Sequence, residues 1–306
     1  MSVDGVDVDG AVARLARVVR ETPFLPGRYG ALKLECLQVT GSYKVRGAYN
    51  ALARQVESGD RRPVVAASAG NHAAGMAWAC RRLGLDATAV VPDAAPATKV
   101  QRCRNSGCTV RRGGQSYEAC EDTARRLAEE RGWRFLHAFD DPDVISGQAT
   151  VGIEIAGQSP EVVYVPIGGG GLASGVAMVL APLGIQVIGV QVEGVDAMRR
   201  LLSRERGIEQ LPFTVADGIR VRRAGTRTAR ICAEMLSDVV TVSETEVREE
   251  VVRLALEERV VAEGAGAVAA AAMAREPGAR KAAVISGGNI DGAMLSELLG
   301  QRLRVA

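Results

Sequence analysis

The chain has 306 residues, with 38 basic and 36 acidic side chains and a net charge of +2. This balance provides no strong field that would hold a nucleic acid or an anionic membrane. Two histidines, His72 and His137, are too few for a three-histidine metal site and leave little choice for a Ser-His-Asp triad. Glycine is in excess, at 35 residues or about 11% against a usual ~7%, and this excess needs an explanation.

The start of the chain, MSVDGVDVDG, is acidic and polar, so we do not expect a signal peptide. No apolar run reaches the ~18 residues of a membrane span. The six cysteines form no C-x-x-C pair, and we expect reduced thiols in a cytoplasmic protein. The spacing Cys103-x4-Cys108 leaves a metal or redox pair as a weaker alternative.

Short β-branched runs alternate with longer helical patterns along most of the chain. We expect strands at 62–67, 87–91, 162–166, 186–192 and 282–286, and helices at 45–57, 71–83, 97–105, 117–131, 171–180, 244–258 and 266–274. This alternation predicts an α/β protein whose parallel sheets carry helices on both faces. Ligands of such folds bind at the carboxyl ends of the strands, where loops lead into helices.

The first segment with unusual chemistry is TGSYKVRG at 40–47. Lys44 lies at an expected helix start, where the helix dipole disfavours a positive charge. A lysine there is reasonable if its amine is neutral and bound as an imine, although most lysines are simply solvated.

Two further segments follow expected strands. SAGNHA at 68–73 opens a helix, and Ser68, Gly70 and Asn71 could grip a carboxylate or merely cap that helix. ISGGN at 285–289 places a hydroxyl, two glycines and an amide after the last strand.

The fourth segment is VPIGGGGL at 165–172, with four consecutive glycines between a strand and a helix. Exposed N–H groups at a helix start predict a phosphate cradle. Two alternatives remain: close strand–helix packing, and a dinucleotide site with Glu193 as the ribose-binding acid.

Taken together, these segments resemble the fold type II pyridoxal-phosphate enzymes, within their serine/threonine dehydratase branch. The matching stretches occur in the family's order from residue 34 to 289: LECLQVTGSYKVRGA, SAGNHAAG, FDDPDVISGQAT, VPIGGGGL, VADGI, EGAGA and SGGN. The resemblance implies a tryptophan synthase β-like fold of two open, twisted parallel-sheet domains, the smaller inserted in the larger. Residues 1–62 and 140–306 would form the large cofactor-binding domain, and 63–139 a small substrate-gripping domain.

The resemblance also implies roles for individual residues. Lys44 would hold pyridoxal 5'-phosphate as an imine and act as the base at the substrate Cα. The phosphate would bind to the backbone N–H groups of Gly168, Gly169, Gly170, Gly171 and Leu172. Around the ring, the implied contacts are Tyr43 over its face, Asn71 at the 3-hydroxyl and Ser286 at the nitrogen. The substrate carboxylate would be enclosed by Ser68, Ala69, Gly70, Asn71 and His72.

The implied activity is β-elimination from threonine, serine or a related β-substituted amino acid, which releases a 2-oxo acid and ammonia. A hydroxyl at the ring nitrogen, unlike an aspartate, does not keep that nitrogen protonated, and this favours prompt elimination. Ala69 stands where racemases of this branch carry a serine, so we expect dehydration rather than racemisation.

The family's cation site matches Glu193, Ala197 and Arg199, and an arginine at the third position opposes a cation, so we expect this metal site to be weak or absent. The acidic residues Asp140, Asp141 and Asp143 indicate a capped helix start instead.

Four functional alternatives remain at this stage: β-replacement, racemisation, a nicotinamide-dependent oxidoreductase and a non-catalytic cofactor-binding protein. For partners, we expect a small amino-acid substrate, a homodimer, and neither nucleic acid nor membrane.

Overall fold

The computed structural model describes residues 5–278 and 280–303. They divide into two compact units, each built around its own sheet. Unit 1 takes in the chain up to Arg20 together with Lys44–Thr150, and unit 2 takes in Glu21–Tyr43 and the chain from Val151 on. The chain of unit 2 is thus interrupted by most of unit 1, as expected for a smaller domain inserted in a larger one. No described helix is both long and apolar enough to cross a membrane.

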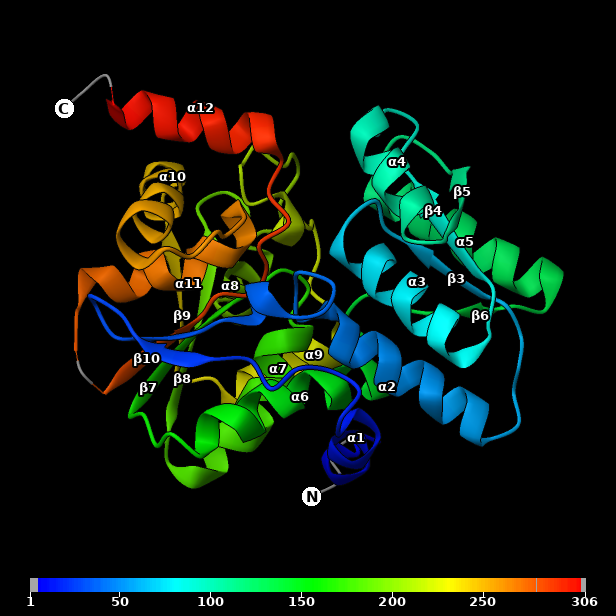
Figure 1. Ribbon diagram of the computed structural model, residues 1–306, viewed down its shortest axis with the longest axis horizontal. Coiled ribbons are helices and arrows are strands. Elements are labelled where there is room, and N and C mark those ends of the chain that lie inside the picture. Colours follow the sequence, from blue (N-terminus) through cyan, green and yellow to red (C-terminus); the bar gives the residue numbers. More distant parts are fainter. Residues whose placement is uncertain (1–4, 279, 304–306) are drawn as a thin grey trace. The chain divides into compact units, whose positions relative to one another are not determined.

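Unit 1 contains a four-stranded parallel sheet in the order β5-β4-β3-β6 (Figure 1). Its strands are β3 (Val64–Ala67), β4 (Ala87–Val91), β5 (Thr109–Arg112) and β6 (Arg134–Phe135). Its helices are α1 (Val8–Leu15), α2 (Lys44–Glu57), α3 (Asn71–Leu83), α4 (Ala97–Asn105), α5 (Tyr117–Arg131) and α6 (Pro142–Ala156), the last of which continues into unit 2.

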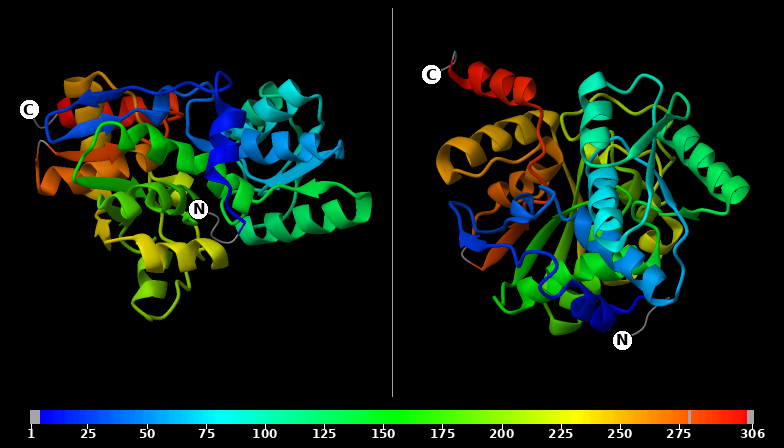
Figure 2. Two further views of the ribbon diagram at one scale, coloured as in Figure 1. Left: turned by 90° about the horizontal axis from the view of Figure 1, so that it is seen from below. Right: turned by 45° about the vertical axis from the view of Figure 1, so that its right-hand side comes forward.

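Alternate residues of the unit 1 strands form two separate hydrophobic clusters. Val64 and Ala66 pack with α2, α3 and α4, whereas Val65 and Ala67 pack with α5. A strand buried on both faces reads as a continuous apolar run, which is why VVAA and ATAVV are recognisable in the sequence. Figure 2 shows α5 lying along one face of these strands.

Unit 2 contains a six-stranded sheet in the order β1-β2-β10-β7-β8-β9. Its strands are β1 (Phe24–Pro26), β2 (Ala31–Lys33), β7 (Val162–Pro166), β8 (Gln186–Val192), β9 (Asp238–Val242) and β10 (Lys281–Val284). All neighbours pair in parallel except β1, which pairs antiparallel with β2. The prediction of parallel sheets is confirmed, with one antiparallel pair at the β1 edge, where a short turn at Gly27–Gly30 joins adjacent strands.

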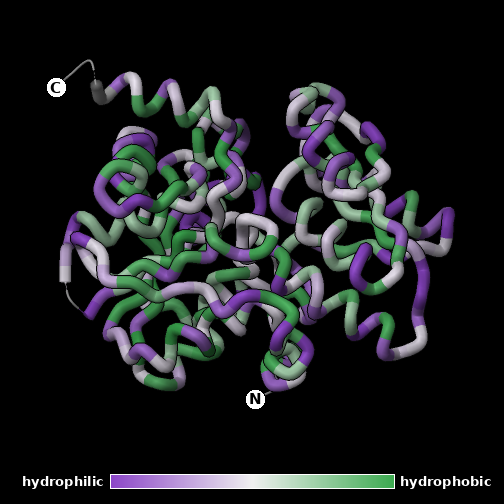
Figure 3. Tube along the Cα trace, in the orientation of Figure 1, coloured by the Kyte–Doolittle hydropathy of each residue, from purple (hydrophilic) through white to green (hydrophobic). Residues whose placement is uncertain are grey.

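Helices cover both faces of this sheet. One face carries α10 (Glu244–Arg253), α11 (Gly264–Arg275) and α12 (Gly292–Leu303), and the other carries α6, α7 (Gly171–Leu180) and α9 (Thr226–Met235) (Figure 1). Figure 3 shows hydrophobic residues concentrated along the strands between these layers. The remaining elements are α8 (Ala197–Leu202), a π-helix at Leu254–Glu258, and short 3-10 turns at Glu35–Leu37, Ala181–Leu183 and Asp217–Ile219.

Local signals explain the helices that the sequence identifies well. The helices expected at 71–83, 97–105, 117–131 and 171–180 are confirmed with the same bounds. For α5, the Ser116 hydroxyl accepts the N–H of Ala119 at the start, and Gly132 ends the helix with φ of +65°. The helix expected at 244–258 instead changes to a π-helix after Arg253.

The two units do not follow the boundaries expected from the resemblance. Residues 5–20, 44–62 and 140–150, expected in the large domain, group with the four-stranded sheet. As a division into functional domains, 1–62 with 140–306 and 63–139 stays a prediction.

Candidate active site

The residues expected at the site are divided between the two units. Unit 1 contains Lys44 and the segment 68–72, whereas unit 2 contains Tyr43, the segment 168–172 and Ser286.

Lys44 is the first residue of α2, so its expected place at a helix start is confirmed. Its Nζ donates a hydrogen bond to the carbonyl oxygen of Ala138, at 2.9 Å. The helix is held closely at this point, because a Cβ atom on Gly75 of α3 would lie 3.1 Å from the Lys44 carbonyl carbon. The absence of a side chain at Gly75 thus lets α3 approach the backbone that carries the lysine.

The segment 68–72 forms the turn from β3 into α3. The Ser68 hydroxyl accepts hydrogen bonds from the N–H groups of Gly70 and Ala73, at 3.1 and 3.3 Å, and so binds the first turn of α3, whose N-cap residue is Gly70. Gly70 is exposed, and a Cβ there would meet no atom within 4 Å. Asn71 begins α3 and is half-buried. This turn therefore offers an exposed backbone at the start of a helix, a suitable environment for a carboxylate.

His72 is buried at 4% exposure, and its Nε2 lies 3.1 Å from the carbonyl oxygen of Leu136. This carbonyl can only accept, so Nε2 carries the proton and Nδ1 is left as an acceptor, with no hydrogen-bond partner among the described residues. Burial, followed by the charge of Lys44, lowers the pKa of His72 to about 3. The imidazole is therefore neutral at physiological pH.

The glycine segment follows β7 and opens α7 in unit 2. Gly170 is the N-cap of α7 with φ of +102°, a conformation that residues with side chains rarely adopt. A Cβ on Gly170 would lie 2.8 Å from Met198 Cε and from Thr228 Cβ, and one on Gly168 would lie 3.1 Å from Ile219 Cα. Both glycines are thus required by their neighbours, so close packing and the exposure of backbone N–H groups are combined in one loop.

Ser286 follows β10, the strand that pairs directly with β7. Because parallel strands end at the same edge, Ser286 and the glycine loop lie at adjacent carboxyl ends of the sheet. The Ser286 side chain is 4% exposed, and its Oγ donates to the carbonyl oxygen of Ala265, at 3.3 Å.

The segments 40–43 and 286–289 are joined although about 245 positions separate them in the sequence. Tyr43 N donates to Ser286 O at 3.1 Å, Gly288 N to Gly41 O at 2.9 Å, and Asn289 Nδ2 to Thr40 O at 2.9 Å. Gly41 has φ of +73°, and a Cβ there would lie 2.4 Å from Asn289 Oδ1. The structure therefore places Tyr43 directly beside the ISGGN segment, a pairing that the sequence does not reveal.

Glu263 is a buried residue of this region that the sequence reasoning did not single out. It is the N-cap of α11 and is 8% exposed, and a Cβ on Gly287 would lie 2.4 Å from its Oε1. Burial, followed by the charge of Glu263, raises the pKa of the Tyr43 phenol above its usual range. Its signals in the sequence are the EGAGA stretch that matches the family and an acid directly before an Ala-rich helix, and the acid by itself equally fits an ordinary cap.

Arg199, which matches the third position of the family's cation site, takes part in an ion-pair network. Arg199 binds Asp196 at 2.6 Å and Glu205 at 2.7 Å, and Arg200 binds Asp196 at 2.8 Å. Burial alone would raise the pKa of Asp196, but the hydrogen bonds from Arg200 and Arg199 outweigh it and leave that pKa low. The acidic group at 140–143 is a helix start as expected, since Asp141 Oδ1 accepts the N–H of Asp143, at 2.8 Å.

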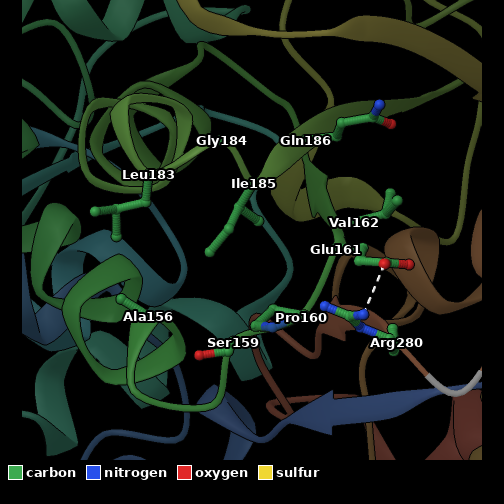
Figure 4. A pocket seen from close by; sticks show the side chains of 10 residues that line it. All are labelled: Ala156, Ser159, Pro160, Glu161, Val162, Leu183, Gly184, Ile185, Gln186 and Arg280. Carbon is green, nitrogen blue, oxygen red and sulfur yellow. Dashed lines mark ion pairs between the residues drawn. The ribbon is translucent and has the colours of Figure 1, made fainter.

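A cavity of about 670 Å³ lies elsewhere in unit 2, where β7 and β8 begin (Figure 4). It is lined by Ala156, Ser159, Pro160, Glu161, Val162, Leu183, Gly184, Ile185, Gln186 and Arg280. Glu161 and Arg280 form an ion pair of 2.9 Å there, and both are exposed. Because the glycine loop follows the opposite ends of these strands, this cavity is separate from the candidate site.

Comparison with known proteins identifies the family of the chain. The family model described as "Pyridoxal-phosphate dependent enzyme" matches residues 16–288. An L-threonine ammonia-lyase from Thermotoga maritima is 43% identical over 281 residues, covering 89% of this chain and 70% of the relative. A catabolic L-threonine dehydratase from Escherichia coli is 39% identical over 280 residues, covering 88% of this chain and 85% of the relative.

Solved structures show the same likeness. The processed threonine deaminase isoform 2 from Solanum lycopersicum matches with a TM-score of 0.88 at 31% identity, covering 96% of this chain and 87% of that one. A maize serine racemase matches with a TM-score of 0.87 at 30% identity, covering 98% of both chains. The chain belongs to the pyridoxal-phosphate-dependent enzymes of fold type II, in their threonine dehydratase and serine racemase branch. This membership decides against the nicotinamide-dependent alternative.

The described residues fit pyridoxal phosphate. The glycine loop presents backbone N–H groups and no side chains at the start of α7, which suits a phosphate. Ser286 places a hydroxyl at the end of the neighbouring strand, and Lys44 provides an amine at the start of α2.

Proposed function

We propose that the chain is a pyridoxal-phosphate-dependent dehydratase that converts L-threonine, L-serine or a related β-substituted amino acid into a 2-oxo acid and ammonia. The observation that carries the proposal is the hydroxyl of Ser286 beside the glycine loop, at adjacent strand ends. The relatives named as threonine ammonia-lyase and threonine dehydratase support it.

In this proposal each residue has a limited task. The N–H groups of 168–172 hold the cofactor phosphate, and Asn71 and Tyr43 hold the ring. The turn 68–72 binds the substrate carboxylate, and the Lys44 amine attaches the cofactor and then takes the proton from the substrate Cα. Pyridoxal phosphate, when bound, delocalises the electron pair left at Cα. When the cofactor is bound, the Ser286 hydroxyl would turn its single hydrogen from Ala265 O to the ring nitrogen without protonating that nitrogen, which favours expulsion of the β-hydroxyl over a long-lived carbanion.

The test is a turnover assay with L-threonine and L-serine that follows the 2-oxo acid and ammonia. Product without any co-substrate supports elimination. A requirement for a second nucleophile would favour β-replacement, rapid D-serine formation would favour racemisation, and no turnover of any β-substituted amino acid would leave a binding protein.

Lys44 can be tested separately, because the chain has only four lysines: Lys33, Lys44, Lys99 and Lys281. We expect Lys44→Ala to abolish both turnover and the borohydride-reducible attachment of the cofactor, whereas Lys281→Ala keeps both. Peptide mapping after reduction should place the label on Lys44, and a label on another lysine would contradict this assignment.

We also propose that the protein is a cytoplasmic homodimer. Light scattering of the purified protein, whose chain mass is 32.2 kDa, tests the oligomeric state.

A further inference from the structure

Two carbonyl oxygens of the glycine loop in unit 2 accept hydrogen bonds from residues that come later in the chain. Gly169 O accepts the Thr228 hydroxyl at 2.6 Å and the N–H of Gly225 at 3.2 Å. Gly170 O accepts the N–H of Ser174 at 2.8 Å, within α7. The N–H groups of Gly168, Gly169 and Gly170 donate to no other group among the described residues.

These bonds fix the direction of the N–H groups. In a trans peptide, the C=O of one residue and the N–H of the next point in opposite directions. Because Thr228 of α9 binds the carbonyl of Gly169, the N–H of Gly170 must point away from α9. A peptide group between two glycines can rotate easily, because glycine allows many backbone conformations, and Gly170 has φ of +102°. A hydrogen bond from outside the loop is therefore needed to keep the Gly170 N–H in this direction.

The Thr228 side chain is well placed to provide this restraint. It is fully buried, and Gly170 has no room for a Cβ because Thr228 Cβ and Oγ1 would both lie 2.8 Å from it. Its hydroxyl also lies 3.2 Å from Gly225 O, but the single hydrogen goes to the closer acceptor, Gly169 O. The Thr228 carbonyl in turn accepts the Ser174 hydroxyl at 3.2 Å, which ties α9 to α7.

We propose that Thr228 is a positioning residue, which holds the Gly169–Gly170 peptide so that the Gly170 N–H faces the cofactor phosphate. The inference rests on the proposed role of the glycine loop. Thr228 itself does not touch the phosphate in this proposal. It acts through the orientation of one peptide group, and its loss therefore weakens recognition of the phosphate and leaves the recognition of the ring unchanged.

The experiment compares pyridoxal 5'-phosphate with pyridoxal, which lacks the phosphate, as ligands of the cofactor-free protein. We expect Thr228→Val, which keeps the shape and removes the hydroxyl, to weaken the binding of pyridoxal 5'-phosphate about 10-fold or more. Binding of pyridoxal should stay within about 3-fold of wild type, since the ring contacts remain. Thr228→Ser keeps the hydroxyl and should restore the wild-type preference for the phosphorylated ligand.

Thr88→Val is the matched control, because Thr88 is a buried threonine of β4 in unit 1. If Thr228→Val does not fold, Thr228→Ala removes the same hydroxyl without adding a methyl group. Unchanged binding of pyridoxal 5'-phosphate, or an equal loss for both ligands, would overturn the role of Thr228. A wild-type protein that binds both ligands equally well would overturn the phosphate cradle itself, so the two failures are distinguishable.

Discussion

Ala69 is the residue whose small side chain bears most directly on the stereochemical outcome. It lies half-buried in the turn between β3 and α3, next to Ser68 and Gly70. A methyl group can neither donate nor accept a proton, so this position offers no acid for the second face of the substrate Cα. The wild-type protein should therefore eliminate water from L-serine much faster than it racemises it.

Ala69→Ser should supply the missing group. A well-placed proton donor contributes about 10²-fold or more to a proton transfer, and a gain of roughly 10-fold in D-serine formation is a conservative expectation here. Chiral chromatography of serine during turnover measures it. Ala74→Ser, on the half-buried part of α3, is the control and should leave the ratio of the two products unchanged. Rapid D-serine formation by the wild type would contradict the argument.

The buried imidazole of His72 should make stability depend on pH. Its pKa of about 3 in the folded protein lies below the ~6.5 of a histidine in an unfolded chain, so the unfolded state binds the proton more readily. Stability from this residue is complete above pH ~6.5 and is lost as the pH falls towards 3. Between pH 7 and pH 5 the loss amounts to roughly 2 kcal/mol.

His72→Gln keeps a donor for the Leu136 carbonyl and removes the titration. Urea unfolding of the cofactor-free protein at pH 7 and pH 5 should show a smaller loss of free energy in the variant than in wild type. Groups that titrate alike in both proteins cancel in this difference. Glu121 and Glu246, with pKa values lowered to about 2, lose their stabilising effect at more acidic pH and do not interfere. Equal losses of unfolding free energy in the two proteins would show that folding does not lower the pKa of His72.

At the level of elements, glycine is used for helix packing as well as for loops. Where α2 crosses α6 in unit 1, a Cβ on Gly147 would lie 2.5 Å from Arg46 O and 2.6 Å from Gly47 Cα. A Cβ on Gly47 would lie 2.7 Å from Val144 O. A glycine in the middle of a helix destabilises that helix by about 1 kcal/mol relative to alanine. The close approach of the two backbones explains why glycine nevertheless stands at both positions.

Gly147→Ala should force these helices apart. We expect a destabilisation of about 1–3 kcal/mol from overpacking, together with weaker cofactor binding, because α2 begins with Lys44. Thermal unfolding and cofactor titration measure the two effects. Gly157→Ala, just beyond α6, is the matched control, since a Cβ there would meet only Glu154 O, at 4.0 Å. A Gly147→Ala variant as stable as this control would disprove the tight crossing.

Elements with a strong local signal could be predicted from the sequence. The helices with clear periodicity, and the strands at 87–91, 162–166 and 186–192, have the predicted bounds. The five strands that were not predicted carry weak signals: β1 and β2 have three residues each, β5 reads TVRR and is largely exposed, β6 has two residues, and β9 is only half-buried. Their pairing depends on neighbouring strands far along the chain, which periodicity does not report.

The same limit applies to the site. The glycine loop and Lys44 each lie in a conspicuous segment beside a strand or helix end, and their local positions follow from it. The bonds between 40–43 and 286–289, and those from Thr228 to the glycine loop, join residues that are distant in sequence and individually ordinary. The high number of glycines in the sequence therefore has three separate structural causes: turns, exposure of backbone N–H groups at a helix start, and the close crossing of α2 and α6.

At the level of the whole molecule, the thiols and many of the acidic side chains are not available as ligands for a divalent cation. All six cysteines are buried free thiols, and burial raises the pKa of Cys36, Cys80 and Cys108 to about 12. Many acidic side chains, such as Asp196, Glu246 and Glu250, are bound by arginines. Across residues 5–278 and 280–303, no group of three His, Cys, Asp or Glu side chains is arranged to hold a metal.

Turnover should therefore not depend on added metal. The Arg199 guanidinium, on α8, binds both Glu205 and Asp196, which lies in the loop between β8 and α8, so a cation at this loop would meet a fixed positive charge and two carboxylates that are already paired. We expect enzyme treated with a chelator to keep its rate within about 2-fold, because no proposed step uses a cation. Added Mg²⁺ or Ca²⁺ should change neither the rate nor the melting temperature. Arg199→Ala removes the positive charge, and the melting temperature of this variant is measured with and without each ion as the control. A wild-type rate that collapses with the chelator and returns with Mg²⁺ would show that the arginine does not substitute for a cation, and that the ligands must come from a rearrangement of this loop.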